Sequence, residues 1–125
     1  MERFGFRTLV VYQKSIQCAV QVSRLCAKIP RDHMDLRWQM RRAVRSVVLN
    51  IAEGSGEFSP KEKARLFRIG RRSGWETVGV FDLGMHEGFF TTADTRMAEG
   101  LLQEVAAILT TMIKKAEARA KGQKN

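Results

Sequence analysis

The sequence predicts an all-α fold, an antiparallel up-down-up-down four-helix bundle formed by a single domain over residues 1–125. Apolar residues recur at helical spacing along nearly the whole chain, and only two of its 125 residues are proline, which leaves room for long helices. Three loop signals divide the chain into helices expected at residues 8–29, 34–53, 60–87 and 92–120. Short loops favour antiparallel neighbours.

The first helix is expected to begin after Thr8 as N-cap and to stop at Pro30. It carries two apolar stripes on roughly opposite sides, whereas a peripheral helix of a monomeric bundle needs only one. One stripe consists of Leu9, Tyr12, Ile16, Ala19, Val20 and Ser23. We expect the other to lie in a contact between subunits, and its residues are Val11, Cys18, Val22, Leu25 and Ile29.

The second and third helices meet at the clearest local signals in the chain. Gly54 is expected to end the second helix, as glycine does just past a C-terminus. Ser59, Pro60 and Glu62 predict a capping box with proline in the first turn of the third helix. The expected core stripe of the second helix is Leu36, Met40, Val44, Val47 and Ile51, and that of the third is Phe67, Gly70, Gly74, Val78, Phe81 and Met85.

The fourth helix is expected to be capped by Thr91 or Thr92. A bundle seam follows at spacings of three and four residues. It consists of Met97, Leu101, Val105, Ile108 and Met112, with Leu102, Leu109 and Ile113 beside it.

Motifs for chemistry are missing from the sequence. His33 and His86 are isolated from other metal ligands, and the two cysteines, Cys18 and Cys26, lie eight residues apart on one expected helix. At about 1.5 Å per residue they are too far apart for a disulfide. No phosphate-binding glycine loop or nucleophile elbow occurs. We therefore expect binding rather than catalysis, with no metal, cofactor or small-molecule substrate. We also expect a cytoplasmic location without membrane contact, since no signal peptide or spanning segment is present.

Positive charge is the better indication of function. The chain has 22 Lys and Arg against 13 Asp and Glu, a net charge of +9. Ten of these Lys and Arg residues lie between residues 37 and 72, a stretch that contains only three acidic residues. Arginine suits bidentate phosphate contact, and an aromatic ring beside it can stack on a base. The candidates for nucleic-acid contact are Arg37, Arg41, Arg42, Arg45, Arg65, Arg68, Arg71 and Arg72, with Trp38 and Trp75.

Two alternatives stay open for these charges, a solvated surface and salt bridges across subunits. A stripe of polar residues is expected to have a structural role. A fully hydrogen-bonded network between helices fixes their register. Its expected members are Gln39, Ser46, Asn50, Glu53, Ser73 and Glu76.

These residues also carry a family resemblance. Residues 39–43, Ser46 and the run Asn50-Ile51-Ala52-Glu53-Gly54 are similar to the signature of the 23S rRNA-intervening-sequence family. Matches to later parts of the signature are Ser59, Glu62, Ile69, Ser73, Glu76, Leu83 and Gly84, and residues 6–14 resemble its start. Departures are Val48 and Leu49, where the family usually has Pro and Ala, Arg45 in an apolar position, and Arg72 in place of a small residue.

The resemblance implies a four-helix bundle that forms a homo-oligomer, with pentameric rings among relatives, in a bacterial cytosolic protein of poorly defined function. Some members are encoded within ribosomal RNA genes, and related accessory proteins of diversity-generating retroelements bind nucleic acid and a reverse transcriptase. Two functions are therefore expected. The first is binding of RNA or DNA, or of a nucleic-acid-bound protein, through the second and third helices. The alternative is an oligomeric scaffold or adaptor without a nucleic-acid role.

Overall fold

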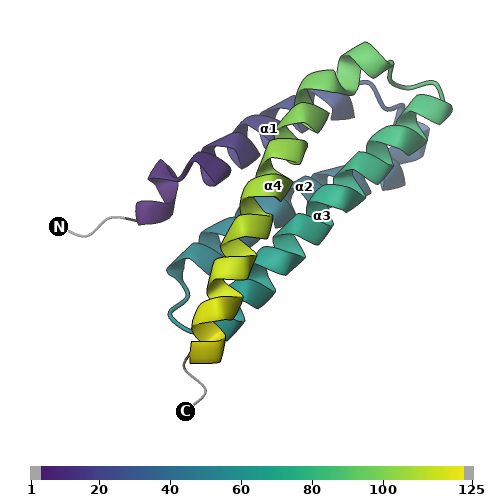
Figure 1. The fold of residues 1–125 in the computed structure, drawn as a ribbon. Coiled ribbons are helices and arrows are strands. Elements are labelled where there is room, and N and C mark those ends of the chain that lie inside the picture. Colours follow the sequence, from purple (N-terminus) through teal and green to yellow (C-terminus); the bar gives the residue numbers. More distant parts are fainter. Residues whose placement is uncertain (1–3, 123–125) are drawn as a thin grey trace.

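Four helices make up the fold in a computed structural model that describes residues 4–122. They are α1 (Val10–Cys26), α2 (Met34–Gly56), α3 (Pro60–His86) and α4 (Thr92–Gly122), and two short 3-10 helices span Gly5–Thr8 and Arg31–His33. Each long helix has two close neighbours: α1 and α3 both pack against α2 and α4 (Figure 1). The backbones of α1 and α3, and those of α2 and α4, do not come close to each other. The all-α prediction is confirmed, and residues 4–122 contain no strand.

Hydrogen bonds from side chains fix the starts of α3 and α4. The Glu62 backbone N–H donates to Ser59 Oγ at 3.2 Å, and Pro60 opens α3 as predicted. The Glu62 carboxylate does not complete the capping box, because Arg65 holds it, and Glu57 Oε1 instead accepts from the Ser59 N–H at 3.1 Å. At α4 the Thr91 hydroxyl and the Asp94 carboxylate accept each other's backbone N–H groups at 3.2 and 2.8 Å.

The ends of α1 differ from the prediction. Thr8 does not cap α1, because its Oγ1 donates to the Gly5 carbonyl at 3.0 Å within the 3-10 turn and the helix starts at Val10. Its other end lies at Cys26, three residues before the predicted one, and Ile29 is buried in the loop that follows.

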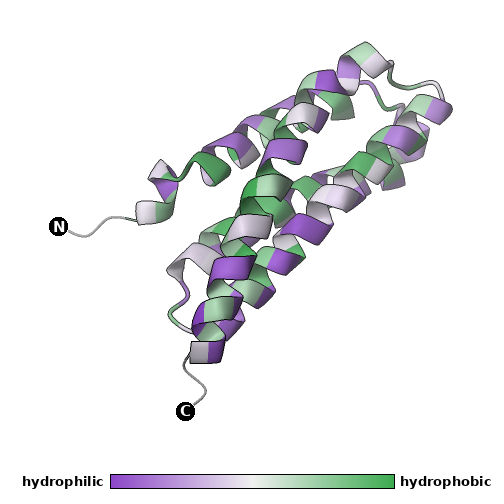
Figure 2. Cartoon of the chain, viewed as in Figure 1, coloured by the Kyte–Doolittle hydropathy of each residue, from purple (hydrophilic) through white to green (hydrophobic). Residues whose placement is uncertain are grey.

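The prediction of which apolar stripe of α1 faces outward was wrong. The stripe assigned to a subunit contact is buried inside the single chain, where Val11, Cys18, Val22, Leu25 and Ile29 are each at most 3% exposed. The outward stripe is the other one: Ile16 and Val20 are 39% and 48% exposed, and Tyr12 and Ala19 are partly buried. Hydrophobic and hydrophilic residues therefore both occur on the outer side of the bundle (Figure 2).

The core stripes of the other helices follow the prediction more closely. All five expected core residues of α2 are buried, with Phe67, Gly70, Gly74 and Phe81 of α3. In α4 the buried line is shifted by about one position, because Leu102, Leu109 and Ile113 are buried with Val105 while Met97 is exposed.

Gly54 lies within α2 rather than after it, which corrects the predicted helix end. The helix continues to Gly56, and Lys63 Nζ donates to the carbonyls of Gly54 and Ser55 at 2.6 and 3.1 Å. Burial lowers the pKa of Lys63, and the nearby charge of Arg119 adds to this. Gly54 instead allows the Phe67 ring of α3 to pack closely against α2, because an added Cβ would lie 2.6 Å from Cε1 of this buried ring.

Substituting Gly54→Ala is expected to lower the free energy of unfolding by about 1–3 kcal/mol, since the core must shift to admit a methyl group. Gly79→Ala is the matched control: it is exposed in α3, and an added Cβ meets nothing within 4 Å. That change should raise stability by up to about 1 kcal/mol through helix propensity. Urea unfolding followed by circular dichroism measures both. Equal effects of the two substitutions would contradict the assigned role of Gly54.

Both cysteines are free thiols without exposed surface on the inner side of α1. The Cys18 thiol donates to the Ala98 carbonyl of α4 at 3.6 Å, and burial raises its pKa to about 12. Burial also raises the pKa of Cys26, while the positive charges of Arg41, Arg37 and Arg45 oppose that rise.

Candidate nucleic-acid interface

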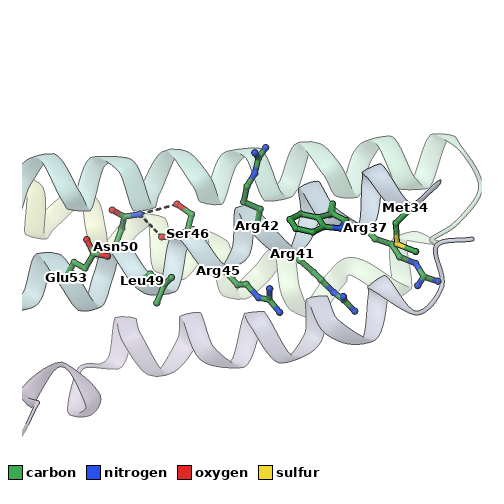
Figure 3. Close-up of a pocket in the computed structure, with 10 residues that line it drawn as sticks. Met34, Arg37, Arg41, Arg42, Arg45, Ser46, Leu49, Asn50 and Glu53 are labelled. Atoms are coloured by element: carbon green, nitrogen blue, oxygen red, sulfur yellow. Dashed lines mark hydrogen bonds between the residues drawn. The ribbon is translucent and has the colours of Figure 1, made fainter. Parts of the chain in front are cut away.

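The outer face of α2 carries a shallow groove of about 470 Å³ (Figure 3). Because the core stripe of α2 points inward, the residues between its members point outward at the same helical period. The groove is lined by Met34, Arg37, Trp38, Arg41, Arg42, Arg45, Ser46, Leu49, Asn50 and Glu53. Met34 and Leu49 belong to this surface and were not predicted from the sequence. Their spacing in the sequence would have indicated this position, because Met34 lies four residues before Trp38 and Leu49 lies four residues after Arg45.

Three arginines of this groove have no acidic partner in the part of the chain that the structure describes. Arg41, Arg42 and Arg45 are exposed, and none forms an ion pair with a carboxylate of residues 4–122. Arg42 extends toward α3, whereas Arg41 and Arg45 extend toward α1 (Figure 3). They occupy little more than one helical turn, so their positive charges repel one another and remain available to an anion.

Arg37 has a structural role instead. Its Nε donates to the carbonyl of Ile29 at 2.8 Å, and its Nη2 donates to the same oxygen. This holds the α1–α2 loop against α2 and satisfies a carbonyl beyond the end of α1. Arg37 is therefore less available for phosphate contact than the arginines that follow it.

The arginines of α3 are mostly engaged within the chain. They border a second hollow of about 570 Å³ that is lined by Arg65, Arg68, Ile69, Arg71, Arg72 and Trp75. Arg65 Nε donates to both carboxylate oxygens of Glu62 at 3.0 Å, and this hydrogen bond lowers the pKa of Glu62. Arg68 Nη1 donates to Glu117 at 2.8 Å, and Arg71 Nη1 to the Thr110 hydroxyl at 3.1 Å. Among the described residues Arg72 alone of these four lacks such a partner.

The two tryptophans are both exposed but differ in their surroundings. Trp38 is 70% exposed and Trp75 is 65% exposed. The Arg71 guanidinium carbon lies 5.8 Å from the centroid of the Trp75 ring, a cation–π contact. No aromatic or cationic group of residues 4–122 makes such a contact with Trp38.

The polar stripe forms a smaller network than predicted. Ser73 Oγ donates to Ser46 Oγ at 2.8 Å, and Asn50 Nδ2 donates to the Ser46 carbonyl and hydroxyl oxygens at 2.8 and 3.1 Å. The helices come close here because Gly70 is buried, and its added Cβ would lie 3.3 Å from the Asn50 Cβ. The other expected members, Gln39, Glu53 and Glu76, are exposed and make no side-chain hydrogen bond among the described residues.

The histidines and acidic residues form no metal centre within residues 4–122, where no group of three or more His, Cys, Asp or Glu side chains could hold an ion. The His33 ring packs edge-on against Phe89, and His86 Nδ1 lies 3.0 Å from the Asp82 carbonyl oxygen. None of the described helices combines the length and the apolar character that a membrane crossing requires.

The comparisons with known proteins agree with the sequence resemblance. A search of curated proteins finds no match. A model of the family described as 23S rRNA-intervening sequence protein matches residues 7–111, a stretch that includes α1, α2, α3 and most of α4. Because this match covers most of the chain, the protein belongs to the 23S rRNA-intervening sequence protein family.

Proposed function

We propose that this protein is a non-enzymatic nucleic-acid-binding protein that contacts RNA or DNA through the outer face of α2. The observation that carries the proposal is the cluster of Arg41, Arg42 and Arg45 on one helix, which are exposed and form no ion pair with a carboxylate of residues 4–122. A guanidinium without an acidic partner can donate two parallel hydrogen bonds to a phosphate group. Arg72 of α3 lines the second hollow and has no acidic partner among the described residues, whereas Arg65, Arg68 and Arg71 are held within the chain. A reducing cytoplasmic location is the natural one for a protein with two free thiols.

An antiparallel up-down-up-down arrangement is part of the proposal. It is supported by contacts in which residue numbers rise on one helix as they fall on the next. On α2 and α3 these contacts pair Ser46 with Ser73 and Gly54 with Phe67. On α1 and α4 the corresponding pairs are Lys14–Glu104 and Cys18–Ala98, and Lys28, just after α1, pairs with Asp94 at the start of α4.

A homo-oligomer is proposed as well, with a corrected interface. On the outward stripe of α1, Ile16 and Val20 are exposed, while Tyr12 and Ala19 beside them are partly buried and pack against the core. Subunit contact would remove this surface from water at about 25 cal/mol per Å². A pentamer, the assembly that the family resemblance implies, would have five times the 14.2 kDa mass of one chain.

A salt titration tests the proposed function. Fluorescence anisotropy with labelled RNA, single-stranded DNA and duplex DNA should give affinities that fall linearly on a log–log plot against salt. The expected slope is about −0.7 for each phosphate contacted on a single strand and about −0.9 on a duplex. Labelled polyglutamate is the control for attraction of any polyanion to a basic protein. Absence of nucleic-acid binding at the lowest salt concentration would favour the alternative, an oligomeric scaffold or adaptor.

A further inference from the structure

The α2 groove combines positive charge with exposed apolar side chains. Leu49 is 57% exposed and Met34 is 46% exposed, and with Trp38 they follow the same side of the helix as the unpaired arginines. Surfaces that only hold phosphates need no such groups, and apolar side chains in water carry a cost in free energy. Their presence beside the arginines calls for a ligand with both an anionic backbone and apolar faces.

We infer that the groove binds single-stranded nucleic acid, with Trp38 stacking on an unpaired base while Arg41 and Arg42 hold the adjacent phosphates. This inference rests on the proposed function and specifies its substrate class. In a duplex the base faces are stacked on one another, so a helix surface such as α2 meets mainly phosphates and sugars. An unpaired base leaves its π-face open, and stacking on an aromatic side chain is tolerant of sequence.

The position of Trp38 suits this role. Arg41 and Arg42 follow it by three and four residues, so both lie one helical turn away at about 5–6 Å between Cβ atoms. They leave α2 in different directions, Arg41 toward α1 and Arg42 toward α3 (Figure 3). A strand that crosses α2 at Trp38 would therefore find a guanidinium on either side of the base. The groove volume of about 470 Å³ lies within the range of small-ligand sites.

Trp75 is the internal comparison. It is almost as exposed as Trp38, but Arg71 lies over its ring and is itself tied to Thr110 of α4. Two of the arginines around Trp75 are neutralised by Glu62 and Glu117. Within residues 4–122, Trp38 has no cation over its ring and lies beside two arginines that form no ion pair. Trp75 is covered by Arg71 and has only Arg72 beside it without an acidic partner.

The test compares Trp38→Leu with Trp75→Leu in anisotropy measurements on labelled oligothymidylate and on a duplex of the same length. Leucine keeps an apolar side chain and removes the aromatic ring. Trp38→Leu is expected to weaken single-strand binding about tenfold or more, with little change in duplex affinity or in the salt slope. Trp75→Leu should change single-strand binding less than twofold, roughly the scatter of such measurements.

Intrinsic fluorescence gives an independent readout, because each variant retains one tryptophan. Oligothymidylate should quench the emission of the Trp75→Leu protein, in which Trp38 remains, and leave that of Trp38→Leu nearly unchanged. Equal loss in both variants, or equal affinity for strand and duplex, would overturn the stacking inference while the proposed function stands. A change in the solution mass of Trp38→Leu with unaltered strand binding would instead assign the groove to a subunit contact. Failure of the unmodified protein to bind either nucleic acid would reject the proposed function itself.

Discussion

Replacing Val22 with glutamate is expected to unfold most of the protein. Val22 is 1% exposed in the core that α1 shares with α4 and α2. A carboxylate introduced there loses its hydration without gaining a partner, at an effective cost of several kcal/mol. Domains of this size have about 5–15 kcal/mol of stability in total, so the variant should lose most of its helical circular dichroism signal or melt far below the unmodified protein.

Val20→Glu is the matched control, two residues away on the outward side of the same helix. Val20 is 48% exposed, so the same substitution should leave the helical signal and melting temperature nearly unchanged. If the outward stripe of α1 is the subunit contact, this folded variant should lose its assembly in light scattering. A folded Val22→Glu protein, or an unfolded Val20→Glu protein, would contradict the assignment of the two stripes.

A triple variant with Arg41, Arg42 and Arg45 changed to glutamate is expected to weaken nucleic-acid binding by about 100-fold or more. Hydrogen bonds to charged groups contribute about 1.5–3 kcal/mol each, and two lost contacts already give this factor. The salt slope should become shallower by about 2–3, since up to three phosphate contacts disappear. The fold should remain intact, because these side chains are exposed and form no ion pair with a described carboxylate. Anisotropy and circular dichroism provide the two measurements.

The triple variant needs a control for net charge, because each substitution changes the charge by two units. Arg24→Glu, Arg96→Glu and Lys114→Glu together make the same change at exposed positions of α1 and α4. We expect this control to weaken binding by less than about tenfold, through long-range electrostatics that salt screens. If both triple variants bound equally weakly, the α2 arginines would have no special role and net charge alone would explain the affinity.

The sequence correctly predicted those features of the fold that depend on residues close to one another in the chain. Ser59 and Pro60 marked the start of α3 correctly, since an N-cap acts within one helical turn. Gly54 was misassigned because glycine serves both helix ends and close helix packing, and only the position of Phe67 distinguishes the two. The two apolar stripes of α1 likewise predicted a helix but not which stripe faces the core. That choice depends on how α2 and α4 pack against α1.

The same distinction applies to the candidate interface. Helical spacing alone predicted that Arg41 and Arg45, four residues apart, share one flank of α2. It could not separate them from the arginines of α3, because Arg68 is paired with Glu117 and Arg71 with Thr110, residues far along the chain on α4. Ion pairs and hydrogen bonds between helices therefore determine which arginines are available to a ligand, and these contacts exist only in the packed bundle.

The buried cysteines have a consequence for how the bundle opens. Cys18 and Cys26 both lie on the inner side of α1, and no other cysteine occurs in the chain. Alkylating reagents attack the thiolate, which requires both solvent access and a lower pKa than burial allows here. Their rate of labelling therefore measures how often α1 detaches from α2 and α4, independently of the stability of the α2–α3 pair. The chain carries a natural reporter of local unfolding at its first helix.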